Sequence, residues 1–419
     1  MSISLVIVLA LALSFAFARV AERYGLTQPG RSGVEYLLLG VILGPHVSAV
    51  VDRSALATLA PFFSVILGVV GFRMGLLLHG PSRTWRSAGP GVLTAVFTGA
   101  TVTGVTLLAQ ELLELGSSTS HWFAVELGAI AMTANETAIR YRSGRLGARG
   151  PVTDQLFATA AAMNVTAVIF FGAALALARG DAPLPGFQPG GVAWFGVSLL
   201  VGGATGFLHH WFVQKNEGED KQFLAIVAVL VFGSGIAFAL GLSPLFVTII
   251  AGILVGRSTP VGDPLHRMVD RLEAPLEVLL LLAVGLSLAP LTGSGWFLVV
   301  AFPLVRLLAV RIGARFGHRS GMGRGLAGVG VLSVAIALEF VLLGGAEGSA
   351  LEAAPSSGAL VVNAVILSLL VTDLLAGAQL RAVLADAGEL HLVPQPEPSA
   401  GLLGAEPPRP QPGPRAGPA

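Results

Sequence analysis

The chain alternates between long apolar runs and short polar segments, and the runs are as long as membrane-spanning helices. A helix needs about 20 apolar residues to cross the hydrocarbon core of a bilayer. The runs cover approximately 2–19, 34–51, 55–78, 88–113, 121–141, 151–178, 191–213, 221–240, 243–257, 274–290, 296–315, 323–346 and 357–381. We therefore predict thirteen transmembrane helices and an all-α integral membrane protein. The eighth and ninth runs are the least separated, because only GLSP at 241–244 lies between them.

Basic residues between the runs predict the orientation. The odd-numbered loops hold Arg19, Arg23, Arg31, Arg73, Arg83, Arg86, Arg140, Arg142, Arg145, Arg149, Lys215, Lys221, Arg257, Arg267, Arg271, Arg311, Arg315, Arg319, Arg324 and Arg381. The even-numbered loops hold Arg53 and Arg179. Because basic loops stay in the cytoplasm, we predict a multi-pass protein of the plasma (inner) membrane with its N-terminus outside and its C-terminus in the cytoplasm.

The composition agrees with a membrane protein. Only 12% of residues are charged, against about 25% in a typical soluble domain, and the mean hydropathy is +0.79. The net charge of +1 offers no argument for a nucleic-acid partner. The absence of cysteine excludes disulfides, thiolate chemistry and cysteine metal sites. We expect no cofactor and no bound metal. The first run lacks a basic leader and a cleavage site, so we interpret it as a retained span.

The chain divides into a membrane part, 1–389, and a tail, 390–419. The tail is rich in proline and glycine, so we predict that it is disordered and that residues 395–419 are dispensable. Within the membrane part, runs one to six and eight to thirteen have equal number and opposite orientation if the seventh is a linker. GVILG at 40–44 and AGILVG at 251–256 occupy the second run of each half. This pattern predicts two inverted repeats, a common plan of transporters.

A glutamate lies within the fifth run, in AMTANETAIRYRSG at 131–144. Glu136 is about 22 Å from the outer face at 1.5 Å per residue, in the inner half of the span. A charge at the bilayer centre costs about 2.5–3.5 kcal/mol, so a charge within a span needs a partner, water or a function. The oxygens of Thr133, Asn135 and Thr137 could replace backbone hydrogen bonds where a helix unwinds. One interpretation is a carboxylate that binds a cation or a proton at a broken helix. The other is an interfacial glutamate that pairs with Arg140 one turn later.

Three further polar residues fall deep within predicted spans. Asn164 lies about 20 Å into the sixth run, and its carbonyl could coordinate a hard cation or join two helices. Arg306 lies about 15 Å into the eleventh run, and we expect a carboxylate partner for it. Glu339 lies in the fifth run of the second half, as Glu136 does in the first; it is either the counterpart of Glu136 in an inverted repeat or a glutamate at the outer interface. Glu277 and Asp373 lie near the ends of their runs, and we interpret them as interfacial.

Several motifs, taken in order, resemble the monovalent cation/proton antiporter superfamily and its Kef-like branch. The resemblance covers roughly residues 5–380. Its motifs are YLLLGVILGPHVSAV, SVILGVVGFRMGLLLH, TAIRYRSGRLGARGPVTDQLFATAAAMNVTAVIFFG, LGLSPLFVTIIAGILVG, PLEVLLLLAVGLSL, ALEFVLLG and VVNAVILSLLVTDLL. The resemblance implies a homodimer that exchanges a monovalent cation for protons by elevator-like alternating access.

The resemblance also implies a division of the membrane part and a site. A dimerisation part would cover about 1–80 and 221–290, and a core part about 88–178 and 296–381. The fifth and twelfth spans would be broken and would cross. The family's ion-binding aspartate falls at Asn164, a basic residue of its eleventh helix falls at Arg306, and Glu136 falls at the crossing. The predicted site is therefore Glu136, Asn164, Asn135 and Thr133, with Arg306 as charge partner and Glu339 as a secondary carboxylate.

The asparagine leaves two functions open. An amide cannot carry a proton at physiological pH, so either Glu136 has taken over the titrating role or the protein does not couple to protons. The leading hypothesis is exchange of Na⁺ or K⁺ for H⁺. The alternative is an ion channel or a membrane sensor on the same scaffold. An intramembrane enzyme is disfavoured, because the spans contain no paired aspartates, no HExxH motif and no arrangement of nucleophile and base.

The predicted topology can be measured with reporter fusions. Fusions after Arg149 and Arg319 are expected to report a cytoplasmic location, because both follow arginine-rich loops. Fusions near Gly116 and Gly348 are expected to report an external location. A cytoplasmic N-terminus, or an even number of spans, would contradict the prediction.

Overall fold

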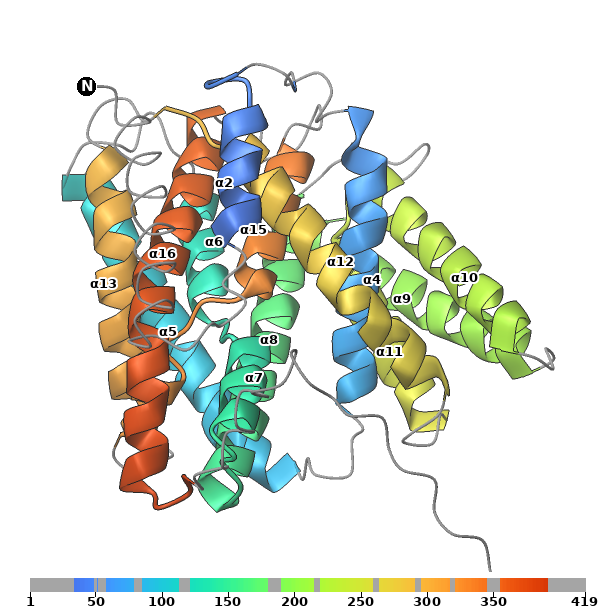
Figure 1. Cartoon of the computed structure of the whole chain (residues 1–419). Coiled ribbons are helices and arrows are strands. Elements are labelled where there is room, and N and C mark those ends of the chain that lie inside the picture. Colours follow the sequence, from blue (N-terminus) through green and yellow to red (C-terminus); the bar gives the residue numbers. More distant parts are fainter. Residues whose placement is uncertain are drawn as a thin grey trace, which may run out of the picture.

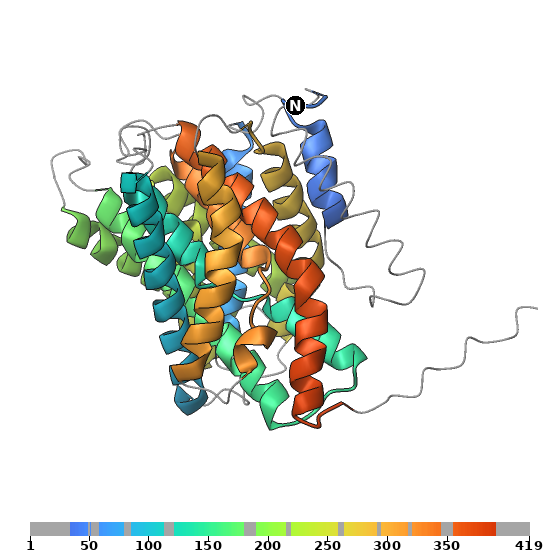
Figure 2. The ribbon, with the colours of Figure 1, turned by 90° about the vertical axis from the view of Figure 1, so that its left-hand side faces the viewer.

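The chain is an all-helical membrane protein in a computed structural model that describes residues 34–48, 51, 58–78, 85–112, 121–179, 190–214, 219–258, 264–290, 295–316, 321–344 and 355–390. Figures 1 and 2 show its helices packed as a bundle. In the first half they are α2 (Val34–Leu43), α4 (Ala60–Leu77), α5 (Trp85–Leu112), α6 (His121–Ala131), α7 (Glu136–Arg145) and α8 (Pro151–Ala178). They continue with α9 (Gly191–Gln214), α10 (Glu219–Ala239), α11 (Pro244–Ser258), α12 (Pro264–Leu286) and α13 (Trp296–Gly313). A 3₁₀ turn, η3 (Ala314–Phe316), precedes α14 (Met322–Gly325), α15 (Val331–Gly344) and α16 (Pro355–Asp386).

Among the described residues, five helices are long and apolar enough to cross a membrane. They are Ala88–Leu112, Pro151–Ala178, Gly191–His209, Trp296–Phe316 and Ser357–Asp386. Large apolar side chains also point outward from the bundle, for example Val192, Leu200 and Phe207 on α9, which are 78%, 71% and 66% exposed. Exposed side chains of this kind suit a surface that faces lipid. These features agree with the predicted class.

The predicted spans correspond closely to the observed helices. The run at 2–19 and the tail from 391 lie outside the described residues, and each other run contains a helix or a broken pair of helices. The eighth and ninth runs are separate, since α10 ends at Ala239 and α11 begins at Pro244. Two boundaries differ from the prediction by more than five residues. The helix predicted at 34–51 ends at Leu43, and the one predicted at 274–290 begins at Pro264.

The pairwise packing has the pattern that two inverted repeats produce. If α2, α4, α5 and α8 correspond to α11, α12, α13 and α16, then the contact of α2 with α12 matches that of α11 with α4. The contact of α5 with α8 likewise matches that of α13 with α16, and all four contacts are present. The broken pair α6–α7 corresponds to the broken pair α14–α15. The fold class predicted from the sequence is thus confirmed, including its two broken spans.

Glycines let the packed helices approach closely. A Cβ atom at Gly75 of α4 would overlap the carbonyl oxygen of Ile249 on α11, and one at Gly252 of α11 would overlap the carbonyl oxygen of Phe72 on α4. The reciprocal contacts mean that two backbones lie against each other with no side chain between them. In a membrane, where helix association depends on close packing rather than on expulsion of water, this contact holds α4 and α11 together.

Substitution of Gly75 tests this contact. Gly75→Val is expected to lower the stability of the detergent-solubilised protein by about 1–3 kcal/mol, the usual cost of overpacking, and so to lower its thermal unfolding temperature. The control is Gly235→Val, because Gly235 has open space around its Cβ position. Equal destabilisation by both variants would show that helix propensity, and not the contact between α4 and α11, sets the effect.

Candidate functional site

Two helices break and cross in the middle of the bundle. The first break, residues 132–135, separates α6 from α7, and the second, residues 326–330, separates α14 from α15. The two links are joined by hydrogen bonds. The Asn135 backbone N–H donates to the Gly328 carbonyl at 3.1 Å, and its Nδ2 donates to the Val329 carbonyl at 3.0 Å. Each link thereby satisfies backbone groups of the other. These groups cannot form hydrogen bonds with water inside a bilayer.

Asn135 and Thr133 hold the crossing through their side chains. Asn135 is the N-cap of α7, because its Oδ1 accepts from the Ala138 N–H at 2.9 Å. The Thr133 hydroxyl lies 2.6 Å from the Ser333 hydroxyl of α15 and donates to the Ile130 carbonyl at 2.8 Å. These contacts explain why short polar residues stand where the apolar run is interrupted.

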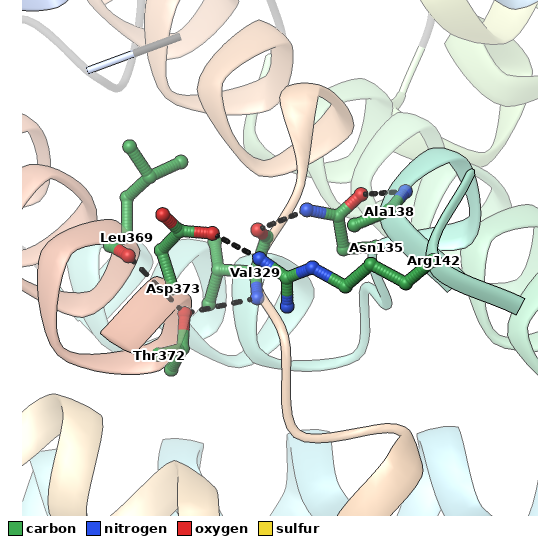
Figure 3. A network of polar contacts seen from close by, with 7 residues as sticks. All are labelled: Asn135, Ala138, Arg142, Val329, Leu369, Thr372 and Asp373. Carbon is green, nitrogen blue, oxygen red and sulfur yellow. Dashed lines mark hydrogen bonds and ion pairs between the residues drawn. The ribbon is translucent and has the colours of Figure 1, made fainter. Parts of the chain in front are cut away.

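Helix α16 supports the second link (Figure 3). The Thr372 hydroxyl accepts from the Val329 N–H at 3.1 Å. One residue later, Asp373 accepts from Arg142 of α7 at 2.6 Å. We predicted Asp373 as interfacial, and the structure shows that it joins α7 to α16. The ion pair and the hydroxyl fix both halves of the crossing to one long helix.

Arg306 lies on the side of the crossing where α6 and α14 end. It is fully buried, and its guanidinium donates to the carbonyls of Thr133 at 2.6 Å, Ala327 at 2.6 Å and Gly328 at 3.3 Å. The prediction of a carboxylate partner for Arg306 was wrong, since its hydrogen-bond partners are backbone carbonyls. A helix C-terminus carries a partial negative charge, so two such ends can together accept a cation. Arg306 supplies that cation.

Asn164 lies across the first link from Arg306. Its side chain is buried, and its Oδ1 accepts from the Ala134 N–H at 2.8 Å. Thus Arg306 binds the carbonyl of Thr133, and Asn164 binds the N–H of the next residue. The two side chains that the sequence placed in one site do converge on the same link, from α13 and from α8.

A cavity of about 100 Å³ opens where α7 and α15 begin. Its lining includes Asn135, Glu136 and Asn164 from the crossing and Gly330 from the start of α15. Opposite them, α4 and α12 contribute Val69, Val70, Arg73, Met74, Leu276 and Glu277. Glu277, which we predicted as interfacial, therefore faces this cavity. Arg306 does not line it, so the arginine and the cavity occupy different sides of the crossing.

Glu136 is the first residue of α7 and lies in this cavity. Its carboxylate accepts from Arg140 at 3.0 Å, and the Glu136 side chain is 16% exposed, against 52% for that of Arg140. The ion pair expected from the spacing of four residues is therefore present. A carboxylate in the first turn is also favoured by the positive end of the helix dipole. The two interpretations of Glu136 are compatible, because the same carboxylate makes the pair and lines the cavity.

Two further glutamates, Glu339 and Glu126, are buried in the bundle outside the Glu136 cavity. Glu339, predicted as a secondary carboxylate, is 1% exposed and lies on α15 away from the cavity. Glu126 on α6 is 4% exposed, and sequence reasoning missed it. The signal was present, since Glu126 lies in the same predicted span as Glu136. The position of Glu126 along this span does not indicate that its helix packs against the helix of Glu339, which lies more than two hundred residues away in the chain.

Sequence reasoning also missed Glu389. This residue follows α16, is buried, and accepts from the N–H groups of Val152 at 2.7 Å and Thr153 at 2.8 Å and from the Thr153 hydroxyl at 2.7 Å. Gly150, the N-cap of α8, has no side chain to satisfy these donors. Glu389 therefore caps the helix that carries Asn164, from a position one residue before the predicted tail.

Comparisons with known proteins identify the fold. No family model and no curated protein matches the chain. The fold is similar to that of the sodium proton antiporter MjNhaP1 from Methanocaldococcus jannaschii at pH 8, with a TM-score of 0.60, 16% identity, and coverage of 90% of this chain and 97% of that chain. For a structure of MjNhaP1 from an electron-microscopy map, the TM-score is 0.55, the identity is 15%, and the coverage is 91% and 96%. At such identities the similarity shows the fold alone.

The contribution of Glu389 to the stability of the fold is expected to depend on pH. Burial raises the pKa of its carboxyl, but the hydrogen bonds from Thr153 and Val152 outweigh burial and hold that pKa below its usual value. A lowered folded-state pKa stabilises the fold above the unfolded-state pKa of about 4.3, and this stabilisation is lost as the pH falls through the folded-state value. Glu389→Gln is expected to cost about 1–3 kcal/mol at neutral pH, measured by thermal unfolding in detergent, and less in acid.

The matched control is Asp386→Asn, an exposed carboxylate three residues earlier. It is expected to leave the unfolding temperature nearly unchanged. If Glu389→Gln lowers the stability by the same amount at every pH, the cap acts through its shape and not through its charge.

Proposed function

We propose that the chain is a secondary transporter that exchanges Na⁺ or K⁺ for protons by alternating access, with Glu136 as the group that binds and releases the proton. The observation that carries the proposal is the position of Glu136, at the start of a broken helix and in the cavity beside the crossing. A carboxylate there can take either a proton or a monovalent cation. Its neighbours Asn135 and Asn164 offer carbonyl oxygens of the kind that bind hard cations.

The surroundings of the cavity support a transport role. One wall comes from α7, α8 and α15, and the opposite wall comes from α4 and α12. Our proposal is that α5–α8 and α13–α16 form a moving core, and that α4 and α10–α12 belong to the dimerisation part. Displacement of the core past this scaffold would expose the Glu136 cavity to the two faces in turn. The proposed protein is a homodimer of the inner membrane, in the Kef-like branch of the cation/proton antiporters.

The two charge-compensating groups suit such a cycle. Arg306 neutralises the ends of α6 and α14 permanently, because a guanidinium keeps its charge at all physiological pH values. On the other side, the starts of α7 and α15 present positive dipole ends to the cavity. These ends favour the ionised form of a carboxylate that lines the cavity, and Glu136 alternates between a bound proton and a bound cation in the proposed cycle.

A second candidate function rests on Asn164 and on the ion pair of Glu136. An asparagine cannot titrate, and the Glu136 carboxylate is paired with the Arg140 guanidinium at 3.0 Å. Both features suit a permanently charged cavity, as in an ion channel or a membrane sensor that does not move protons. Proteoliposomes separate the two functions, because an exchanger acidifies or alkalinises the lumen only when a cation gradient is imposed.

The test of the proposal is Glu136→Gln in sealed proteoliposomes with a pH dye. This variant is expected to reduce Na⁺- or K⁺-dependent proton movement to the level of protein-free liposomes, because the amide cannot release a proton. Asn164→Asp is expected to alter coupling, since it adds a second titratable group at the same link. The control is Glu111→Gln, an exposed carboxylate at the end of α5, which is expected to transport as the wild type does.

Normal exchange by Glu136→Gln would remove Glu136 from the proposed mechanism. If neither the wild type nor Asn164→Asp moves protons against a cation gradient, the channel or sensor function replaces the exchanger. Ion conductance in the same liposomes would then be the next measurement.

A further inference from the structure

Two buried carboxyl groups lie on α6 and α15, two helices that pack against each other beside the crossing. Glu126 lies five residues before the end of α6, and Glu339 lies eight residues after the start of α15, about 12 Å along that helix. The two helices pack against each other, and Figure 1 shows them side by side. Glu126 is 4% exposed and Glu339 is 1% exposed. Neither residue lines the Glu136 cavity.

The carboxyl oxygens of this pair are not satisfied by the protein. Oε1 of Glu126 and both oxygens of Glu339 have no hydrogen-bond partner in the described part of the chain. The two groups are close enough for the charge of one to act on the other. Glu126 and Phe340, the neighbour of Glu339, also line one small cavity of about 10 Å³, roughly the space that a single water molecule needs.

The start of α11 lies beside Glu339. The carboxyl faces the Ser243 hydroxyl and the backbone N–H of Leu245, without a hydrogen bond of good geometry. Ser243 is one residue before α11 and caps it, since its Oγ accepts from the Phe246 N–H at 3.0 Å. A helix start favours a negative charge, so of the two carboxyls Glu339 is better placed to be ionised.

Of the charged side chains that the structure describes on the surrounding helices, Arg179 comes near the pair, because it follows Ala178 of the small cavity and reaches Gly241 before α11, and the others lie elsewhere. Arg179 at the end of α8 stacks over the Trp194 ring at 4.0 Å. Asp154 and Arg257 lie toward the opposite ends of α8 and α11 from the parts that meet the pair. Arg73 of α4 and Glu277 of α12 line the Glu136 cavity. Asp373 of α16 is paired with Arg142, and His121 lies at the first residue of α6.

We propose that Glu126 and Glu339 form a proton-binding site, in which one proton is held between the two carboxyl groups. Two adjacent carboxylates repel each other and cannot both stay ionised in a buried place, and each unpaired charge in the membrane would cost several kcal/mol. One proton, bound by Glu126, removes a charge from the pair and relieves the repulsion. The remaining negative charge then faces the start of α11.

This site does not depend on the proposed transport function. A proton held by the pair is present in a channel or a sensor as well as in an exchanger. It can therefore be measured on the purified full-length protein without any transport assay.

The experiment is infrared difference spectroscopy of the protein in lipid nanodiscs across a pH series. The C=O stretch of a protonated carboxylic acid is expected to persist at neutral pH in the wild type and to disappear in the Glu126→Gln/Glu339→Gln double variant. In Glu339→Gln alone, the signal of Glu126 is expected to be lost at a lower pH than in the wild type, because the neighbouring negative charge is gone. Glu111→Gln, at an exposed carboxylate, is the control and is expected to leave the signal unchanged.

Wild-type protein alone provides a second measurement, in case the variants do not fold. Dicyclohexylcarbodiimide reacts with protonated carboxyl groups in apolar surroundings, and peptide mass spectrometry is expected to find the adduct on Glu126. The proposal is overturned if the wild type shows neither the band nor the adduct at neutral pH, or if the double variant keeps the band. Loss of the band on addition of Na⁺ or K⁺ at constant pH would show that the pair binds the cation instead, and would also overturn it.

Discussion

Backbone groups released where two helices break inside the bilayer are the constraint on which this structure depends. Each break leaves carbonyls at one helix end and N–H groups at the next, and the hydrocarbon offers them no water. The carbonyls of Thr133, Ala327 and Gly328 are satisfied by Arg306. The Ala134 N–H is satisfied by Asn164, and the Gly328 and Val329 carbonyls also accept from Asn135. The crossing is thus a polar network. On one side the Arg306 guanidinium satisfies its carbonyls, and on the other side it borders the Glu136 cavity.

The charges follow from the directions of the four half-helices. Two C-termini meet at Arg306, and two N-termini meet at the cavity that contains Glu136. A positive group on the first side and a negative group on the second compensate the dipoles. This arrangement gives Asn164 a structural reason to be where it is, because an acceptor oxygen is all that the Ala134 N–H requires. In the cavity, the carboxylate nearest to the same link in sequence is Glu136, the first residue of α7.

Support for the crossing comes from distant parts of the chain. Thr372 and Asp373 of α16 bind the second link and α7 (Figure 3), and Glu389, just beyond α16, caps α8. The last helix therefore holds both broken segments and the helix of Asn164 in one unit. On the opposite wall of the cavity, close backbone contacts at Gly75 and Gly252 join α4 to α11. The cavity lies between these two groups of contacts, which is where the proposed transport cycle places the relative motion.

The sequence by itself predicted the spans and the polar residues that interrupt the fifth span, because apolar length and short polar side chains are local properties. The break in the twelfth span was expected only from the resemblance to the cation/proton antiporters. The sequence identified Thr133, Asn135, Glu136, Asn164 and Arg306, and it predicted the Glu136–Arg140 pair from their spacing. Only the tertiary structure decided what these side chains bind. Arg306 donates to carbonyls that lie 173 and 21 residues away in the chain, and Arg142 pairs with Asp373, which lies 231 residues away. The spacing of residues fixes contacts along one helix, whereas contacts between helices depend on their rotation and crossing, which the packing of all the helices sets together.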